Sequence, residues 1–540
     1  MRILYLFAFA LLGAALQPVN AQTRYVDSSF AVSAATEVVY ANNFDILRMA
    51  NRDLMMDIYQ PVGDTTTTER PMVVIWPTGS FLPQYFNGSP YGSRKDSVNV
   101  EIAKRLVQRG YVAAVAEYRV GWSPTADQDT RTGTLLRAVY RAGQDAHAAG
   151  RFLRKTVAED NNPYNIDTSR LVYWGNGSGG YLALAHAFLD DIDEILTNPD
   201  FYDEDGVQLV SEEVNSNPQG TTTTAQNVVN HPGYMSDVAL TVNMAGALGD
   251  TAWIDTTENE PGVIAYHSFT DPFAPFNAGL VQVPVPNGSL PVIDVLGSNT
   301  IIAIANGSGL NDAMAPANAL QLPAPFSALS TAVNQRNAAY KNITRTSPIP
   351  GNTDDSFPLS RDNMYPILRN RGASPTAGIY NWFDETTLRA QITGINANVP
   401  GANINADAVV EGEDITNPNR NNPAEAKLFI DTMMAHFIPR AWYQLELADI
   451  TVSTEDLLTN ASVGLEIFPN PGTTGFTIRV ANSERIRQID VYDLRGSRVA
   501  QVKGIDQSSY VLDRGNLANG SYIIQLRFDE GTTARKVFLR

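Results

Sequence analysis

The chain has 540 residues, a net charge of −18 and no cysteine. We expect no nucleic-acid partner, because nucleic-acid binding usually needs a basic surface, and the same acidity disfavours adsorption to anionic lipid. Without cysteine there can be no disulfide and no thiolate nucleophile. The five histidines lack a metal-binding spacing such as H-E-x-x-H, so neither a metal nor a cofactor is predicted.

Residues 1–21 are predicted to be a signal peptide. Arg2 supplies a positive start, residues 3–16 are apolar, and small residues precede Gln22, so cleavage is expected after Ala21. The alternative is a short membrane anchor. It is disfavoured because the apolar run is shorter than the roughly 20 residues of a spanning helix. No later run is long enough to span a membrane.

Residues 22–450 are predicted to form an α/β domain with a mostly parallel sheet flanked by helices. Apolar runs without alternation are typical of strands buried on both faces. Residues 136–157 carry apolar side chains at helical spacing between two such runs, which indicates right-handed strand–helix–strand crossovers. The runs lie at 72–76, 111–116, 171–174 and 262–266.

Two stretches fit this alternation poorly. Residues 191–230 and 277–425 are rich in Asn, Thr, Pro and Gly, and we expect long surface insertions there, part of which could form a lid. The acidic turn at 203–206 does not match a calcium-binding loop, so a solvated turn is expected. A helix at 424–434 closes the domain, and residues 451–462 are a predicted linker.

The last part, 463–540, is predicted to be a small antiparallel β-sandwich. Short apolar strands separated by Gly and Asn turns are typical of that fold. The segment also resembles the C-terminal sorting domain of Bacteroidetes type IX secretion cargo. The resemblance rests on five submotifs in order: FPNP at 468–471, GF at 475–476, VYDLRG at 491–496, LANGSY at 517–522 and KVFLR at 536–540.

The resemblance implies the type IX secretion machinery as a partner. It also implies passage through the periplasm and outer membrane, removal of the tail and, in many members, attachment to the cell surface. The alternative is a carbohydrate-binding or adhesion sandwich. It is disfavoured because the tail contains no tryptophan that could serve as a sugar platform.

The large domain resembles secreted carboxylesterases and lipases of the α/β-hydrolase superfamily. The likeness runs from DIYQP at 57–61, through RGYV at 109–112 and EYR at 117–119, to Asp271. It implies an α/β-hydrolase fold and a Ser–Asp–His triad in that chain order.

The nucleophile motif of that family, G-x-S-x-G, is altered here to GNGSGG at 175–180. Aligning the outer glycines, Gly175 and Gly179, places Gly177 where the nucleophile belongs. Ser178 then falls at the position whose N–H helps to form the oxyanion hole. We therefore expect Gly177 at the tip of the turn with a positive φ angle. The alternative is a one-residue slip that makes Ser178 the nucleophile.

The other site positions are partly retained. Gly79, in PTGSF at 77–81, stands where the family has an oxyanion loop, so a backbone donor is expected there. Asp271, in HSFTDP at 267–272, matches the triad acid, although a turn-capping aspartate is equally compatible. His436 is the only histidine after Asp271. It falls in or near the last helix, where a packed structural histidine is the favoured interpretation.

Two functions follow. The favoured one is an exported pseudoenzyme that keeps the hydrolase fold and binds an ester or glycan. The alternative is an active carboxylic-ester hydrolase that uses Ser178, Asp271 and His436. Without a general base, a serine hydroxyl is barely nucleophilic at neutral pH, which favours the first.

Overall fold

The computed structural model describes residues 23–66, 68–255, 260–285, 288–352, 355–368, 382–417, 422–449, 463–481, 484–493, 498–528 and 532–540. The predicted signal peptide and the predicted linker lie outside these ranges. The chain divides into two compact units, with the division between Leu447 and Ala448. Among the helices described, none is long and apolar enough to cross a bilayer.

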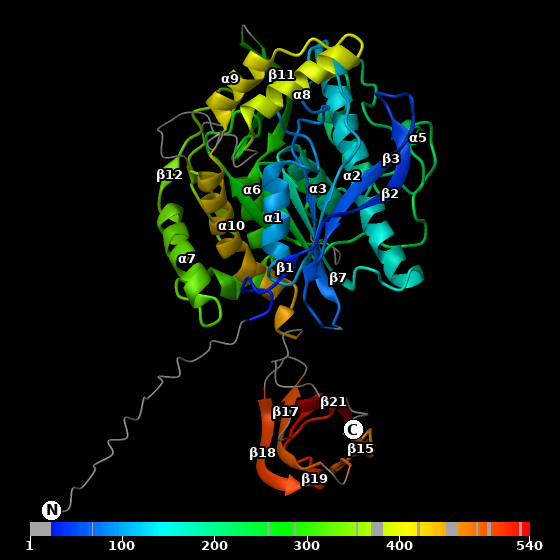
Figure 1. Ribbon diagram of the computed structural model, residues 1–540, viewed down its shortest axis with the longest axis vertical. Coiled ribbons are helices and arrows are strands. Elements are labelled where there is room, and N and C mark those ends of the chain that lie inside the picture. The colour runs from blue at the N-terminus through cyan, green and yellow to red at the C-terminus, as the bar shows by residue number, and fades with distance from the viewer. Residues whose placement is uncertain are drawn as a thin grey trace, which may run out of the picture. The chain divides into compact units, whose positions relative to one another are not determined.

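The first unit is built on an eight-stranded sheet (Figure 1). The strands stand in the order β14-β9-β8-β7-β5-β6-β3-β2. Only the pairs β2–β3 and β3–β6 are antiparallel, which confirms the predicted, mostly parallel sheet. The strand bounds are β2 (Thr36–Asp45), β3 (Ala50–Tyr59), β5 (Arg70–Trp76), β6 (Val112–Ala116), β7 (Ile166–Asn176), β8 (Leu240–Met244), β9 (Gly262–His267) and β14 (Met364–Pro366).

Helices cover both faces of this sheet, as two neighbouring residues of β7 show. Successive strand side chains point to opposite faces. The Tyr173 ring packs against His186 of α3 (Ser178–Phe188), and its hydroxyl donates to the carbonyl of Ala146 in α2 (Gln128–Glu159). The Trp174 ring instead contacts Phe437 of α10 (Pro423–Gln444), which lies beside α1 (Ser97–Val107). The unbroken apolar runs therefore reflect burial on two sides.

The segment 277–425 is not only a surface insertion, and here the structure corrects the prediction. β14 pairs in parallel with β9 and extends the sheet. The helix α6 (Ser298–Ser308) buries Ile301 and Ile302 against the main core. β14 has only three residues and ends in Pro366, so it is too short to stand out as an apolar run. The segment also contains the hairpin β10 (Ala278–Val285) and β11 (Gly288–Leu296) and the helix α7 (Ser327–Lys341).

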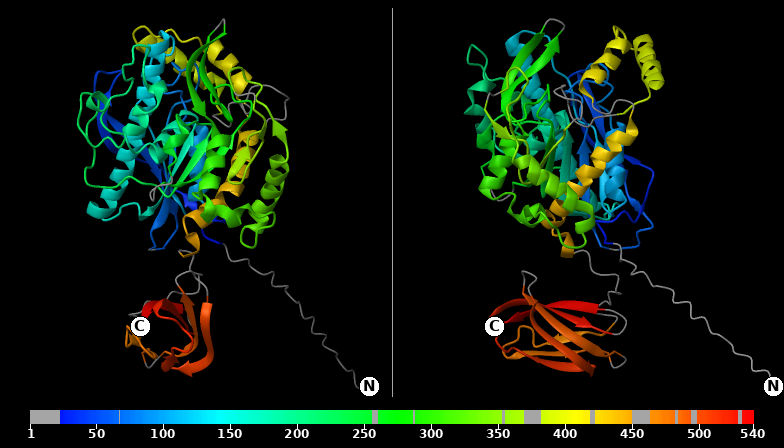
Figure 2. Two further views of the ribbon diagram at one scale, coloured as in Figure 1. Left: turned by 180° about the vertical axis from the view of Figure 1, so that it is seen from behind. Right: turned by 90° about the vertical axis from the view of Figure 1, so that its left-hand side faces the viewer.

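Two further helices of this segment lie at the carboxyl end of the sheet (Figures 1 and 2). α8 (Glu385–Asn398) and α9 (Ala406–Thr416) pack on each other through a small apolar cluster of their own, which also takes in Tyr85. By contrast, 191–230 holds only the short helices α4 (Asp193–Leu196), η1 (Pro199–Phe201) and α5 (Glu212–Asn215).

The second unit has two antiparallel sheets, one of three strands (β15-β16-β19) and one of four (β18-β17-β20-β21). Its core joins Phe476 and Ile478 of the first sheet to Val491, Ile524 and Val537 of the second. The predicted antiparallel sandwich is thus confirmed. The strands are β15 (Glu466–Phe468), β16 (Gly475–Arg479), β17 (Ile486–Asp493), β18 (Arg498–Gln507), β19 (Ser509–Asp513), β20 (Gly520–Arg527) and β21 (Thr532–Leu539).

Candidate active site at the β7–α3 turn

Gly177 occupies the tip of the sharp turn between β7 and α3. Its backbone angles are φ 53° and ψ −118°, and it is the N-cap residue of α3. Positive φ is costly for side chains other than glycine. The prediction that Gly177 rather than Ser178 stands at the tip with positive φ is confirmed. Where an active hydrolase presents a serine on a strained turn, this chain presents no side chain.

The glycines on either side of the tip are required by packing. A Cβ on Gly175 would lie 2.1 Å from the carbonyl oxygen of Gly179, and one on Gly179 would lie 2.2 Å from that of Trp76. A Cβ on Gly180 would lie 2.5 Å from the Asn243 side chain. Real Cβ atoms do not approach other heavy atoms so closely. The turn therefore keeps the tight geometry of a nucleophile elbow although the nucleophile position is glycine.

Ser178, the first residue of α3, has its hydroxyl held by a tyrosine. Ser178 Oγ lies 2.8 Å from the Tyr118 hydroxyl, which also lies 2.8 Å from the carbonyl oxygen of Pro77. Because the phenol donates to that carbonyl, the serine hydroxyl donates to the phenolic oxygen. Burial raises the pKa of Tyr118, so the phenol stays protonated at neutral pH and cannot act as a base. Tyr118 lies two residues after the end of β6, and nothing in the sequence pattern marked this contact.

Three consecutive residues of the predicted oxyanion loop have positive φ angles, which is strained at the two that are not glycine, Ser80 and Phe81. Gly79, Ser80 and Phe81 have φ angles of 138°, 53° and 53°. Non-glycine residues with positive φ are uncommon, and they gather at functional sites. The Gly79 carbonyl accepts from Leu82 N–H at 3.0 Å, and the Ser80 carbonyl accepts from the Trp122 indole at 2.7 Å. The Ser178 N–H, at the start of a helix, has no intrahelical acceptor. The Ser178 N–H is therefore a backbone donor next to the tip.

Asp271 lies in the segment after β9, as predicted, and caps a turn there. Its Oδ1 accepts the N–H groups of Phe273 at 2.8 Å and Ala274 at 3.1 Å. Its Oδ2 is buried without a hydrogen bond and faces His267 Nε2, which is 3.6 Å away. Ser298 Oγ accepts from Asn243 at 3.0 Å and lies 2.8 Å from His267 Nδ1.

His436 is a packed core residue, which is the interpretation that the sequence favoured, and only the alternative function placed it in a triad. It lies inside α10, has no exposed surface, and its Nδ1 is 3.2 Å from the Tyr266 hydroxyl. Its ring contacts Tyr266 and Tyr365. Burial, together with the charge of Arg440, holds the pKa of His436 well below its ordinary value. The helix buries the imidazole in the core, on the α10 side of the sheet.

The other histidines are also engaged away from the tip. His147 Nδ1 lies 2.8 Å from Ser236 Oγ, His186 Nε2 lies 3.1 Å from the Ser236 carbonyl, and His231 Nε2 lies 2.7 Å from the Tyr40 carbonyl. Burial lowers the pKa of His186 to about 3. In the part of the chain that the structure describes, no imidazole is hydrogen-bonded to Ser178, and no group of three or more His, Asp and Glu residues could hold a metal ion.

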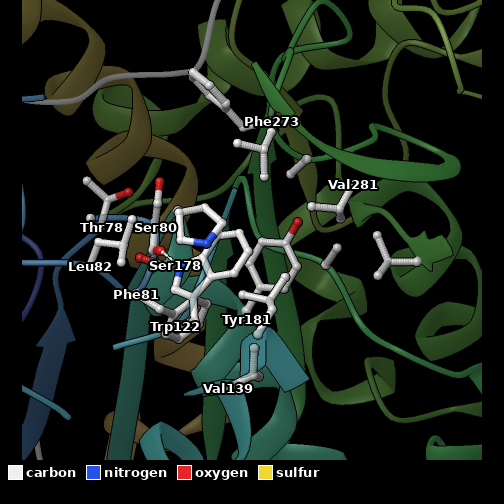
Figure 3. Close-up of a pocket in the computed structure, with 18 of the residues that line it drawn as sticks. Thr78, Ser80, Phe81, Leu82, Trp122, Val139, Ser178, Tyr181, Phe273 and Val281 are labelled. Carbon is white, nitrogen blue, oxygen red and sulfur yellow. Dashed lines mark hydrogen bonds between the residues drawn. The ribbon is translucent and has the colours of Figure 1, made fainter. Parts of the chain in front are cut away.

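The turn opens into a cavity of about 700 Å³ (Figure 3). Gly177 and Ser178 line its floor with the loop at 78–82, and Gly412 and Glu413 of α9 line it from the opposite side. Among the described residues around it, Glu413 has the one charged side chain, and its Oε2 accepts from Asn417 at 3.1 Å. The remaining walls are largely apolar and aromatic and include Phe81, Trp122, Val139, Tyr181, Phe201, Trp253, Phe273 and Val281.

Comparison with known proteins matches separate parts of the chain. Residues 56–215 match the family model BD-FAE, and residues 466–540 match that of the secretion system C-terminal sorting domain. No curated protein matches the chain.

Solved structures give a weak likeness. A thermophilic esterase from Thermogutta terrifontis with bound propionate is 19% identical over 45% of this chain and 75% of its own, with a TM-score of 0.26. The α/β hydrolase MGS-M1, from a Medee basin deep-sea metagenome library, is 14% identical over 45% of this chain and 72% of its own, with a TM-score of 0.25. At these scores the likeness says nothing about the chemistry of the site.

Proposed function

We propose that this chain, which carries an esterase-like BD-FAE domain and a type IX secretion sorting domain, is an exported ligand-binding pseudoenzyme and not a serine esterase. The sorting domain marks it for delivery to the cell surface or beyond. The observation that carries the proposal is Gly177 at the tip of the β7–α3 turn with φ 53°. The position that presents the nucleophile in an active relative has no side-chain oxygen.

The remaining chemistry supports the same conclusion. Serine hydrolysis needs a base within hydrogen-bond reach of the hydroxyl. Ser178 instead donates to Tyr118, a protonated phenol, and His436 is enclosed by α10 and the sheet. Loss of triad members removes most of the rate, although backbone donors and binding alone can leave roughly 10³–10⁴-fold over water. Faint turnover is therefore compatible with the proposal.

The cavity favours a particular ligand class. Its volume lies within the roughly 300–1,000 Å³ of small-molecule sites, and such sites combine apolar walls with a few polar groups. Here the polar groups include the Ser178 N–H at the start of α3, beside rings such as Phe81 and Tyr181. An aromatic or acyl compound with one ester or acid oxygen fits this arrangement. A glycan fits it less well, because the walls are largely apolar and aromatic.

The alternative, hydrolysis by Ser178, rests on one observation: Ser178 lines the cavity together with the loop at 78–82. Labelling with a fluorophosphonate probe separates the two functions. We expect no covalent labelling of the purified protein, of Ser178→Ala or of His436→Ala, with an active serine esterase as the positive control. Labelling of the wild type that disappears in Ser178→Ala would establish the alternative.

Binding is tested with the fluorescent probe 1-anilinonaphthalene-8-sulfonate. Val139 of α2 lines the cavity, so Val139→Trp should fill it and weaken probe binding at least tenfold. Val207→Trp is the matched control, because Val207 is 59% exposed and lies outside the cavity. Equal probe affinity in all three proteins would contradict the proposed ligand site.

A further inference from the structure

A second cavity of about 420 Å³ lies behind the segment 121–123. It is lined by that segment, by α2 residues that include Arg137 and Arg141, and by parts of the loops 46–47 and 208–226. Trp122 lines both this cavity and the one at the β7–α3 turn. The second cavity belongs to no part of the esterase-like site, and it differs from the first in having cationic walls.

Arg141 is the central group of this second cavity. The residue is 3% exposed, and its Nη2 donates to the Gly121 carbonyl at 2.8 Å. Its Nε is buried with no hydrogen-bond partner, and among the described residues it forms no ion pair. Burial, and the like charges of Arg119 and Arg137, lower the pKa of Arg141 to about 10. At neutral pH the guanidinium therefore remains charged in a poorly solvated place.

The carboxylates nearest to Arg141 already have other partners. Asp145 is bound to Arg119, with Oδ1 2.8 Å from Nε and Oδ2 2.7 Å from the Arg119 N–H. Asp45 is bound to Arg52, whose Nε lies 2.6 Å from Oδ2, and it also accepts the Leu47 N–H at 2.8 Å. Neither carboxylate forms a hydrogen bond with Arg141. An unpaired buried charge is costly unless a counter-ion reaches it.

Arg137, one helical turn before Arg141, adds a second cation. Its Nη1 donates to the Leu209 carbonyl at 2.7 Å, and no carboxylate in the described residues pairs with it. Thr134 and Ser123 line the same cavity, while Leu47, Trp122 and Val214 form an apolar rim. Leu47 and Val214 are exposed, which leaves the rim open to solvent. The cavity thus combines a cationic floor with an apolar mouth.

We propose that this cavity binds the carboxylate group of a small organic acid, held by Arg141 and Arg137, with its organic part against the apolar rim. A guanidinium offers a planar fork that matches a carboxylate, and such charge-assisted pairs are among the stronger hydrogen bonds in proteins. An inorganic oxyanion such as phosphate would satisfy the charge but would leave the rim uncovered. The volume suits a small acid and not a polymer.

Calorimetric titration with benzoate at constant ionic strength tests this site. We expect benzoate to bind, benzyl alcohol not to bind, and phosphate to bind at least tenfold more weakly than benzoate. Arg137→Gln and Arg141→Met should each weaken benzoate binding at least tenfold. All these titrations are done in the Val139→Trp background, because the filled first cavity can then bind neither benzoate nor benzyl alcohol, so failure here is distinguishable from failure of the ligand site at the turn.

Arg141 is buried, so its replacement could unfold the chain, and a third variant keeps the test decisive. Ser123 is exposed and lines the cavity, so Ser123→Glu should place a carboxylate at the arginines, raise the melting temperature and abolish benzoate binding. Ser29→Glu, at an exposed position outside the cavity, is the control. Unchanged benzoate affinity in Arg137→Gln and Ser123→Glu, equal binding of benzyl alcohol, or tighter binding of phosphate would each overturn the proposal.

Discussion

The hydroxyl of Ser178 lies 2.8 Å from the hydroxyl of Tyr118. The serine thus has a fixed, neutral partner in place of the imidazole that would activate it. The phenol is fixed in turn by the Pro77 carbonyl at 2.8 Å and by edge contacts of its ring with Trp76 and Phe81. The arrangement joins the start of α3 to the strained loop at 79–81.

Removing the Tyr118 hydroxyl should therefore weaken the fold without creating a nucleophile. In Tyr118→Phe the Pro77 carbonyl and Ser178 Oγ lose their shared partner, and an unsatisfied buried polar group costs about 1–3 kcal/mol. Urea denaturation of Tyr118→Phe, Ser178→Ala and the double variant gives the coupling energy. We expect the two losses to be less than additive. Additive losses would show that the two hydroxyls do not interact.

The glycines of the turn should differ sharply in their tolerance of a methyl group. Gly177→Ala should cost about 1–2 kcal/mol in unfolding free energy, because its positive φ is unfavourable for alanine. Gly179→Ala should prevent normal folding, because its Cβ would lie 2.2 Å from the Trp76 carbonyl oxygen. Gly307→Ala, in α6 with open space around it, is the control and should be neutral or stabilising. Equal losses in the first two variants would argue against the close approach at Gly179.

The buried ion pair behind the cationic cavity should be sensitive to loss of one partner. The side chains of Arg119 and Asp145 are 1% and 0% exposed. Asp145→Asn leaves an unpaired buried guanidinium and should lower the unfolding free energy by about 3–5 kcal/mol. Lys155→Ala breaks an exposed pair with Glu159 and should cost less than about 1 kcal/mol. Chemical denaturation measures the loss of unfolding free energy in each of the two variants. Similar losses would contradict the expected difference between the buried and the exposed pair.

Asp96 should make stability fall as pH rises through neutrality. Its Oδ2 accepts the N–H groups of Gly92 and Ser93 at 3.0 and 3.3 Å, but burial raises its pKa from 3.8 to about 7. Between these values the folded state binds more protons than the unfolded state. The stability from protonated Asp96 is therefore present below the unfolded pKa and lost toward pH 7, by up to about 1.4 kcal/mol for each pH unit.

The variant Asp96→Asn stays neutral and isolates this effect. Its unfolding free energy relative to the wild type should rise between pH 4.5 and 7 and level off above pH 7, as measured by urea denaturation across the range. Asp205→Asn, at an exposed turn position, should show no such trend. A pH-independent difference for Asp96→Asn would mean that the carboxyl group is ionised throughout the range.

The two compact units should fold separately. Each has its own core, and the predicted linker 451–462 joins them. We expect fragments 23–447 and 463–540 each to unfold cooperatively in calorimetry, and limited proteolysis of the full chain to cut within 451–462. Loss of structure in either isolated fragment would show that the units depend on each other.

The sequence predicted the parts of the fold that have strong periodic or spacing signals. The runs at 72–76 and 171–174 became central strands because both of their faces are covered, and the glycines at 175 and 179 fixed the turn with Gly177 at its tip. The two antiparallel sheets of the tail followed from short alternating strands between turn residues.

Other features could not be predicted from the sequence, because they depend on tertiary contacts. β14 has three residues, too few for a periodic signal, yet it extends the sheet. The sequence placed His436 in or near a helix. Only the packing of its imidazole against Tyr266 and Tyr365 shows that the side chain is enclosed. The contact between Tyr118 and Ser178 joins residues 60 positions apart, and no local pattern reports it.

Glycine at the tip of the turn also affects the balance between the stability of the folded state and catalytic activity. Active sites commonly hold residues in backbone conformations that weaken the folded state, and stabilising substitutions there tend to cost function. At position 177 glycine adopts φ 53° without the penalty that a serine would carry. The exchange relieves the scaffold of that penalty while the glycines at 175 and 179 preserve the shape of the turn. Under the proposed function, an enzyme engineer could use this chain as a relaxed host in which a nucleophile and a base are introduced together.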